Sequence, residues 1–173
     1  MKKKALIPFL ITCFLIISIK SYKYLYKPNR VAIGHGEYAF DITDKELLVG
    51  WADNVFIGTV LKKEKEIKDD VSPLSIYEVK VEENIKGNLY GNIKISHRGG
   101  YDNDKKVLFR FEGDDYLKVG AKYLFVSRYD SETSTHRIVP VEGDIALDSK
   151  EKEQKVKKEF ERAKVNQKNY LND

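Results

Sequence analysis

The sequence predicts a mainly β protein: an OB-like barrel of five to six strands, with a short helix before the first strand and a charged C-terminal helix. Three observations support this fold class. Strand-forming Val, Ile, Tyr and Phe residues are plentiful. Apolar and polar residues alternate in several segments, as in sheets with one wet face. Turn signals separate these segments at the short intervals typical of small barrels.

The run Ala52–Leu61 organises the domain, because a helix is expected to end there and the first long strand to begin. Gly58 interrupts the apolar run, and a glycine inside a strand usually marks a bulge or a tight bend. Upstream, Thr43 and Glu46 fit a capping box with Thr43 as the N-cap. They predict a helix over 44–52 that plugs one end of the barrel.

The other strands follow from apolar alternation between turns that contain glycine, proline and aspartate. The expected strands cover 54–66, 74–85, 92–98, 107–111, 123–126 and 137–141. From Lys150 to about Gln167 the chain is charged and has helical propensity. Its apolar stripe is narrow and consists of Val156, Phe160 and Ala163. We therefore expect this helix to rest lightly on the barrel or to project from it.

The N-terminus has the pattern of a secretory signal, with basic residues at 2–4 and an apolar stretch over 5–19. Interfacial tyrosines and lysines extend it, so the sequence predicts a membrane segment over 1–27 that contacts the membrane through residues 5–26. The first expectation is an uncleaved single-pass anchor in the cell membrane, with the body extracytoplasmic. A cleaved signal, which would give a secreted protein, and a lipoprotein processed at Cys13 are the alternatives.

The charge distribution bears on the partners of the remaining chain, which divides into a linker (28–43), the OB-like domain (44–148) and a charged helix and tail (149–173). The formal net charge is +4, but the basic excess lies at the ends. Residues 31–149 carry 22 acidic and 16 basic groups. A nucleic-acid-binding protein needs a basic footprint to neutralise phosphates. The body lacks one, which argues against a nucleic-acid partner.

Motifs for catalysis are absent from the sequence. Cys13 is the only cysteine, so we expect neither an intramolecular disulfide nor a cysteine metal cluster. There is no G-x-S-x-G elbow and no H-E-x-x-H pair, and the three histidines are scattered: His35, His97 and His136. Residues 34–39 fit G-x-G-x-x-A, but no strong strand is expected before them and no helix after them. We interpret that match as coincidence and predict no catalytic residue.

The first expectation is that the protein has no cofactor, but two acidic loops offer oxygen ligands for calcium. Asp102, Asn103 and Asp104 lie in one loop, and Asp114 and Asp115 in a second loop that a barrel could bring near. The spacing does not match an EF-hand. The alternative is that these carboxylates simply stabilise turns through local hydrogen bonds.

Candidate binding residues lie where OB barrels usually bind, along strands 2 and 3 and the adjacent loops. They are Tyr77, His97, Arg98 and Tyr101, whose rings and guanidinium suit a sugar, a peptide or a loop of a partner protein. The alternative is that each is an ordinary barrel or solvated position.

An ordered series of segments resembles a known family: 52–60, 77–81 with 86–87, 99–100 and 117–126. It looks like the secreted bacterial domains related to the tissue-inhibitor-of-metalloproteinases and netrin modules, which have an OB-type barrel. The resemblance covers about residues 44–147. The animal inhibitors act through a cysteine-led N-terminus. This body contains no cysteine, so no inhibitory residue carries over.

These observations lead to one expected function. The sequence predicts a non-catalytic, membrane-anchored, extracytoplasmic interaction module at the cell surface, with a protein or a cell-envelope component as its partner. An enzyme with an unrecognised active site and a nucleic-acid-binding OB domain are the alternatives.

Overall fold

The computed structural model describes residues 30–169, which form a mainly β fold. Strands account for 46% of the described residues and helices for 16%, which confirms the mainly β character that the sequence predicts. The largest sheet contains six strands: β2 (Asn54–Ile67), β3 (Leu74–Lys86), β4 (Asn92–Arg98), β7 (Lys122–Asp130), β8 (Thr135–Ile138) and β9 (Asp144–Ala146).

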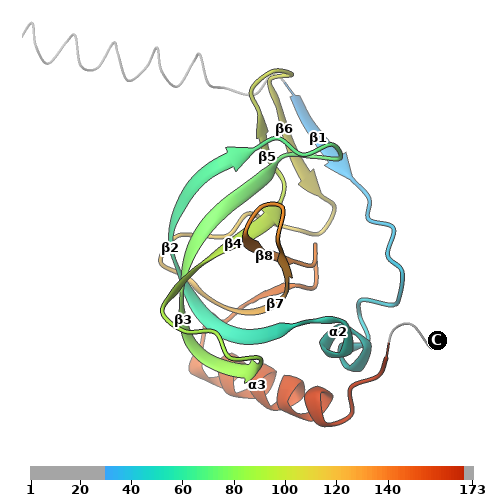
Figure 1. Ribbon diagram of the computed structural model, residues 1–173, viewed down its shortest axis with the longest axis vertical. Coiled ribbons are helices and arrows are strands. Elements are labelled where there is room, and N and C mark those ends of the chain that lie inside the picture. Colours follow the sequence, from blue (N-terminus) through green and yellow to red (C-terminus); the bar gives the residue numbers. More distant parts are fainter. Residues whose placement is uncertain (1–29, 170–173) are drawn as a thin grey trace, which may run out of the picture.

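Five strands of this sheet close into a ring (Figure 1). β2 pairs antiparallel with both β3 and β7, and β3 pairs with β4. β4 then pairs in parallel with β8, which returns to β7. β9 extends the sheet from β7. The first three strands match their predicted ranges to within one residue, whereas β8 begins two residues earlier than expected.

Gly58 lies at an irregularity of the ring, as predicted. The register of the β2–β3 pairing shifts between Ile57 and Gly58. A Cβ at Gly58 would lie 2.8 Å from both the carbonyl oxygen of Lys80 and a methyl carbon of Val79. The bend therefore requires a residue without a side chain, because the neighbouring strand passes too close.

A second sheet of three strands lies at one end of the ring, opposite the two helices (Figure 1). It consists of β1 (Arg30–Gly34), β6 (Val107–Phe111) and β5 (Gly100–Asp102), with β6 in the centre. β1 runs parallel to β6. The segment expected as a linker thus contains a strand, because its partner lies far along the chain and local sequence does not reveal the pairing.

The first helix, α2 (Lys45–Trp51), is capped one residue later than predicted. The side chain of Asp44 accepts hydrogen bonds from the backbone N–H groups of Glu46 and Leu47. Thr43, the predicted N-cap, instead donates its hydroxyl to Asp41. Asp44 is thus the N-cap, and an aspartate satisfies the free N–H groups of a first turn at least as well as threonine.

The C-terminal helix, α3 (Lys150–Val165), is an integral part of the domain. Its predicted stripe of Val156, Phe160 and Ala163 is buried, and Phe160 is fully inaccessible. These side chains join a core cluster with residues of α2 and of the ring, including Leu48. The expectation of a lightly resting helix was wrong, since one large aromatic side chain compensates for the narrowness of the stripe.

A second core cluster lies inside the ring. Its centre is formed by Phe56 and Phe125, whose rings stack with centroids 5.2 Å apart. No helix within residues 30–169 is long and apolar enough to cross a membrane. The predicted membrane segment, 1–27, lies outside the described residues.

Candidate functional site

A buried cluster of three titratable side chains lies between strands of the ring and the loop after β6. It contains His97 on β4, Asp114 in the β6–β7 loop and Asp144 at the start of β9. Nε2 of His97 is 3.2 Å from Oδ1 of Asp114 and 3.9 Å from Oδ1 of Asp144. The three side chains are 2%, 4% and 7% exposed. The fold therefore brings one imidazole and two carboxylates together out of reach of bulk water.

The hydrogen bonds of this cluster are incomplete. Oδ2 of Asp114 accepts from the backbone N–H of Val141 at 3.1 Å. Val141 has a φ of 74°, a strained conformation for a β-branched residue. Oδ1 of Asp144 and Nδ1 of His97 are buried and have no hydrogen-bond partner among the described residues. Buried polar atoms in native proteins are normally satisfied, so these two call for an explanation.

Burial is the main influence on the ionisation of Asp144. It raises the pKa of Asp144 to about 9, with a further contribution from the negative charge of Asp114. Asp144 therefore keeps its proton at neutral pH. Within residues 30–169, these three are the only group of three or more His, Cys, Asp or Glu side chains placed to share a metal ion. The arrangement can hold a proton or bind a cation.

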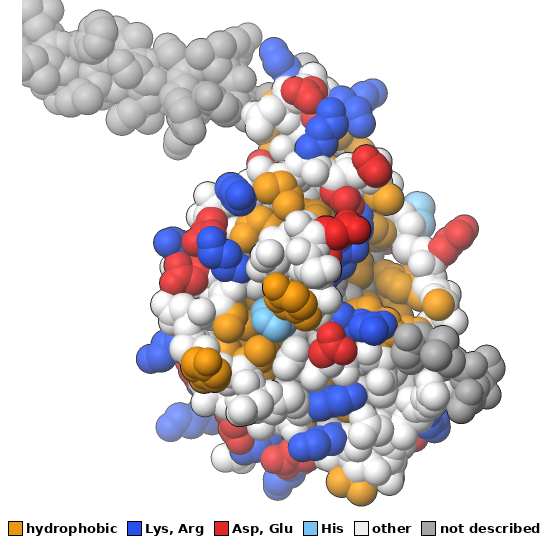
Figure 2. Space-filling view, viewed as in Figure 1, with side chains coloured by type: hydrophobic (Ala, Val, Ile, Leu, Met, Phe, Trp, Pro, Cys, Tyr) orange, Lys and Arg blue, Asp and Glu red, His pale blue; other side chains and the backbone are white. Residues whose placement is uncertain are grey.

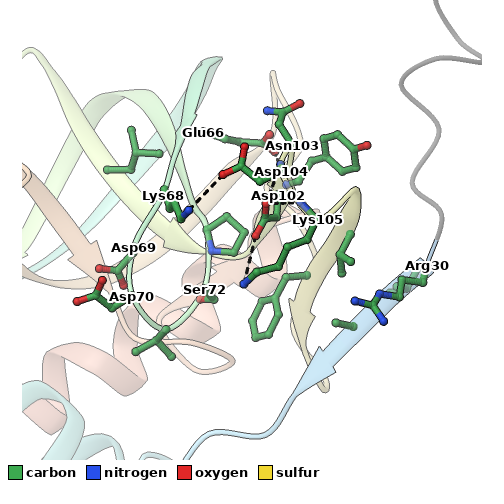
Figure 3. Close-up of a pocket in the computed structure, with 18 residues that line it drawn as sticks. Arg30, Glu66, Lys68, Asp69, Asp70, Ser72, Asp102, Asn103, Asp104 and Lys105 are labelled. Atoms are coloured by element: carbon green, nitrogen blue, oxygen red, sulfur yellow. Dashed lines mark hydrogen bonds and ion pairs between the residues drawn. The ribbon is translucent and has the colours of Figure 1, made fainter.

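A surface cavity of about 760 Å³ lies at the other candidate site, beside the three-stranded sheet (Figure 3). Three segments line it: the start of β1, the end of β2 with the β2–β3 loop, and the β5–β6 turn. The last two are joined across the cavity by an ion pair of 3.1 Å between Lys68 and Asp104. Segments far apart in sequence thus form one concave surface.

The four predicted binding residues do not form one surface. Tyr77 is 1% exposed and belongs to the core inside the ring. Arg98 makes a 2.7 Å ion pair with Asp69 and so fixes the β2–β3 loop. Tyr101 lines the cavity, whereas His97 belongs to the buried cluster.

The four carboxylates considered for calcium also do not converge. Asp102 accepts two backbone hydrogen bonds within its own turn, of which the bond from Lys105 is the main cause of its lowered pKa. Asp104 pairs with Lys68 on the cavity wall. Asp115 is 89% exposed and pairs with Arg110 at 3.3 Å, while Asp114 is in the buried cluster.

Sequence reasoning named two members of the buried cluster and missed the third. His97 was a binding candidate and Asp114 a calcium candidate, in separate sets, and Asp144 was not considered. Its signal is an acidic residue that opens a short apolar segment, Asp144–Leu147. Such a short segment does not indicate whether its acidic residue faces solvent or the interior.

The fold and these sites define a class of small mainly β domain: a five-stranded ring that carries an accessory sheet, a surface cavity and a buried His–Asp–Asp cluster. No protein-family model matches the chain, and no curated protein matches it either.

Proposed function

We propose that the chain is a membrane-anchored, extracytoplasmic, non-catalytic binding module with an OB-like barrel, related to the modules named for the tissue inhibitors of metalloproteinases and netrins. The strand order of the ring supports the barrel type. In chain order the ring strands are β2, β3, β4, β7 and β8. The first, β2, pairs with the second, β3, and the fourth, β7, and the third, β4, lies parallel to the fifth, β8. This connectivity agrees with a five-stranded Greek-key barrel.

The observation that carries the proposal is the position of the cavity. It lies against the loop between the first two ring strands, residues 68–73, which is one of the loops that OB barrels use for binding. Its volume of about 760 Å³ is within the usual range of ligand sites. β1, which follows directly on the predicted membrane segment, forms one wall.

The lining of the cavity favours a polypeptide segment with a basic side chain. Five acidic residues face three basic ones: Glu66, Asp69, Asp70, Asp102 and Asp104 against Arg30, Lys68 and Lys105. Val31 and Val71 are 54% and 73% exposed at this site and offer apolar contacts. β1 is also an edge strand among the described residues, and an extended peptide can pair with such an edge.

The charge of the surface does not favour nucleic acid. Acidic and basic side chains are interspersed over the face in Figure 2, without a continuous basic stripe. The acidic excess of the cavity lining would repel phosphates. The mixed surface charge and the acidic excess of the cavity lining fit a protein partner at the cell envelope, which is the partner that we propose.

The test is site-specific photo-cross-linking of the full chain in intact cells. A cross-linkable residue at Val71 should yield one discrete adduct. The same residue at Val165, which is 82% exposed on α3 and outside the cavity, should yield none. Absence of an adduct at Val71, or the same adduct from Val165, would contradict the proposal.

A charge variant sharpens the test. Asp70 lines the cavity and makes no ion pair with another described residue, so Asp70→Lys should abolish the adduct without disturbing the fold. Asp115→Lys, at an exposed position outside the cavity, should leave the adduct unchanged. An adduct that survives Asp70→Lys would show that the acidic lining does not select the partner.

A further inference from the structure

We propose that His97, Asp114 and Asp144 form a binding site for one divalent transition-metal ion, with Zn²⁺ as the first ion to test. The candidate ligand atoms, one from each side chain, all lie within 4.8 Å of one another. This site is independent of the surface cavity, since none of the three residues lines it.

The distances suit a small ion. In a tetrahedral zinc site with bonds of about 2.0–2.1 Å, neighbouring ligand atoms are roughly 3.4 Å apart. The separations of 3.2 Å and 3.9 Å from Nε2 of His97 to the two carboxylates bracket that value. Shifts of a few tenths of an ångström are enough to bring His97 to the spacing of a zinc ligand with either carboxylate. The two carboxylate ligand atoms lie within 4.8 Å of each other and close on the ion when it binds.

The unsatisfied oxygen of Asp144 points to a ligand independently of the distances. The Asp144 side chain is 7% exposed, and Oδ1 receives no hydrogen bond from any described residue. This same oxygen faces Nε2 of His97. A buried carboxyl oxygen without a hydrogen-bond partner is costly, and a cation coordinated by it removes that cost.

The three ligands are held by different, well-anchored elements. His97 lies on β4, at a position paired with Ser75 of β3. Asp144 pairs with Phe125 of β7. Asp114 is oriented by the Val141 N–H, which bonds Oδ2 and leaves Oδ1 facing His97. Hydrogen bonds of this kind orient the ligands of metal sites.

The donor atoms decide which metal fits. One imidazole nitrogen with two carboxylates suits Zn²⁺, and also Mn²⁺ or Fe²⁺, whereas Ca²⁺ prefers oxygen ligands alone. Three protein ligands supply three of the four positions that Zn²⁺ takes, and a water molecule can supply the fourth. Bound metal would connect β4, the β6–β7 loop and β9, and would stabilise the folded chain by mass action.

The experiment uses the full chain in detergent, stripped with a chelator and then titrated with Zn²⁺. We expect one Zn²⁺ per chain by elemental analysis after gel filtration, saturable binding by calorimetry and a rise in Tm. The Co²⁺-loaded protein should show visible absorption bands of a four- or five-coordinate ion. A wild-type chain that takes up no stoichiometric Zn²⁺ would overturn the proposal.

Matched variants separate this cluster from surface binding. Asp114→Asn and Asp144→Asn should each weaken Zn²⁺ binding at least about tenfold and remove the Co²⁺ bands. The neighbouring Asp115→Asn and the exposed His35→Gln should behave as wild type. Equal affinity in Asp144→Asn and Asp115→Asn would refute the site. Asp144→Asn keeps the shape of the side chain, so it decides the matter even if Asp114→Asn fails to fold.

Discussion

The ionisation of Asp144 opposes folding at neutral pH. Burial raises its pKa to about 9, whereas an aspartate in the unfolded chain titrates near its ordinary value of 3.8. The folded state therefore binds this proton more tightly. The resulting stabilisation is complete below about pH 4 and is lost as the pH rises through about 9.

The variant Asp144→Asn cannot ionise. Without metal, we expect its advantage over wild type to grow as the pH rises from 4 to 9, by up to about 1.4 kcal/mol per pH unit, because only the wild type loses the stabilisation linked to this proton. Thermal melts between pH 4 and pH 9 in the presence of a chelator measure the effect. Asp115→Asn is the control, and parallel curves for Asp144→Asn and wild type would contradict the expectation.

Two tyrosines, the buried Tyr77 and the half-buried Tyr116, affect stability at the alkaline end of the pH scale. Burial raises the pKa of Tyr77 and of Tyr116 to about 12 in each case. Their contribution to stability is present below about pH 10 and is lost as the pH rises through about 12. Tyrosinate absorbance should show a late group of titrating residues. Tyr116→Phe should remove one of them, whereas Tyr90→Phe, at an 85% exposed position, should leave the late group intact.

At the scale of elements, the bend in β2 depends on Gly58. A methyl group there would meet the backbone of β3 at 2.8 Å. We expect Gly58→Ala to lower the free energy of unfolding by about 1–3 kcal/mol through overpacking. Denaturant unfolding measures this change. Gly91→Asn is the control, because Gly91 has no atom within 4 Å of its Cβ position and asparagine tolerates its positive φ. Equal losses in both variants would mean that close approach is not the cause.

The attachment of α3 depends chiefly on Phe160. Its side chain is fully buried against the core shared by α2 and the ring. Phe160→Ala should cost about 3–5 kcal/mol, the usual loss for a buried aromatic. Val165→Ala, at the exposed end of the same helix, should change stability by less than about 0.5 kcal/mol. Denaturant unfolding of both variants distinguishes an integral helix from an accessory one.

Strands with a clear apolar pattern between turns were predictable, including the five-residue β6, which matches its predicted range of 107–111. Most of the other short strands were not. β2, β3 and β4 have apolar patterns of seven residues or more between clear turns, and their predicted bounds were close. β5 and β9 have three residues each, too few for a period to appear. β1 has five residues but pairs with a strand more than seventy positions away. Local sequence carries no record of such a partner.

For the whole molecule, contacts between segments distant in sequence also limit how much of the candidate sites could be predicted. The residues of the cavity and the buried cluster come from segments that meet only when the ring and the small sheet are assembled. His97 and Asp114 were identified by residue type, but their contact depends on the path of the β6–β7 loop. Asp144 lies in β9, a three-residue strand that forms by pairing with the edge of β7.

β1 is placed to bear any force between the membrane and the domain. It follows directly on the predicted membrane segment, and no strand of the ring pairs with it. In the proposed orientation, tension on the domain would load the five-residue β1–β6 pairing before it reached the ring. Release of residues 30–43 would give a tether segment with an extended length of roughly 45 Å, at about 3.3 Å per residue. It would also remove one wall of the cavity. Detachment of this one short strand would therefore let the domain move further from the membrane and at the same time weaken its binding of a partner.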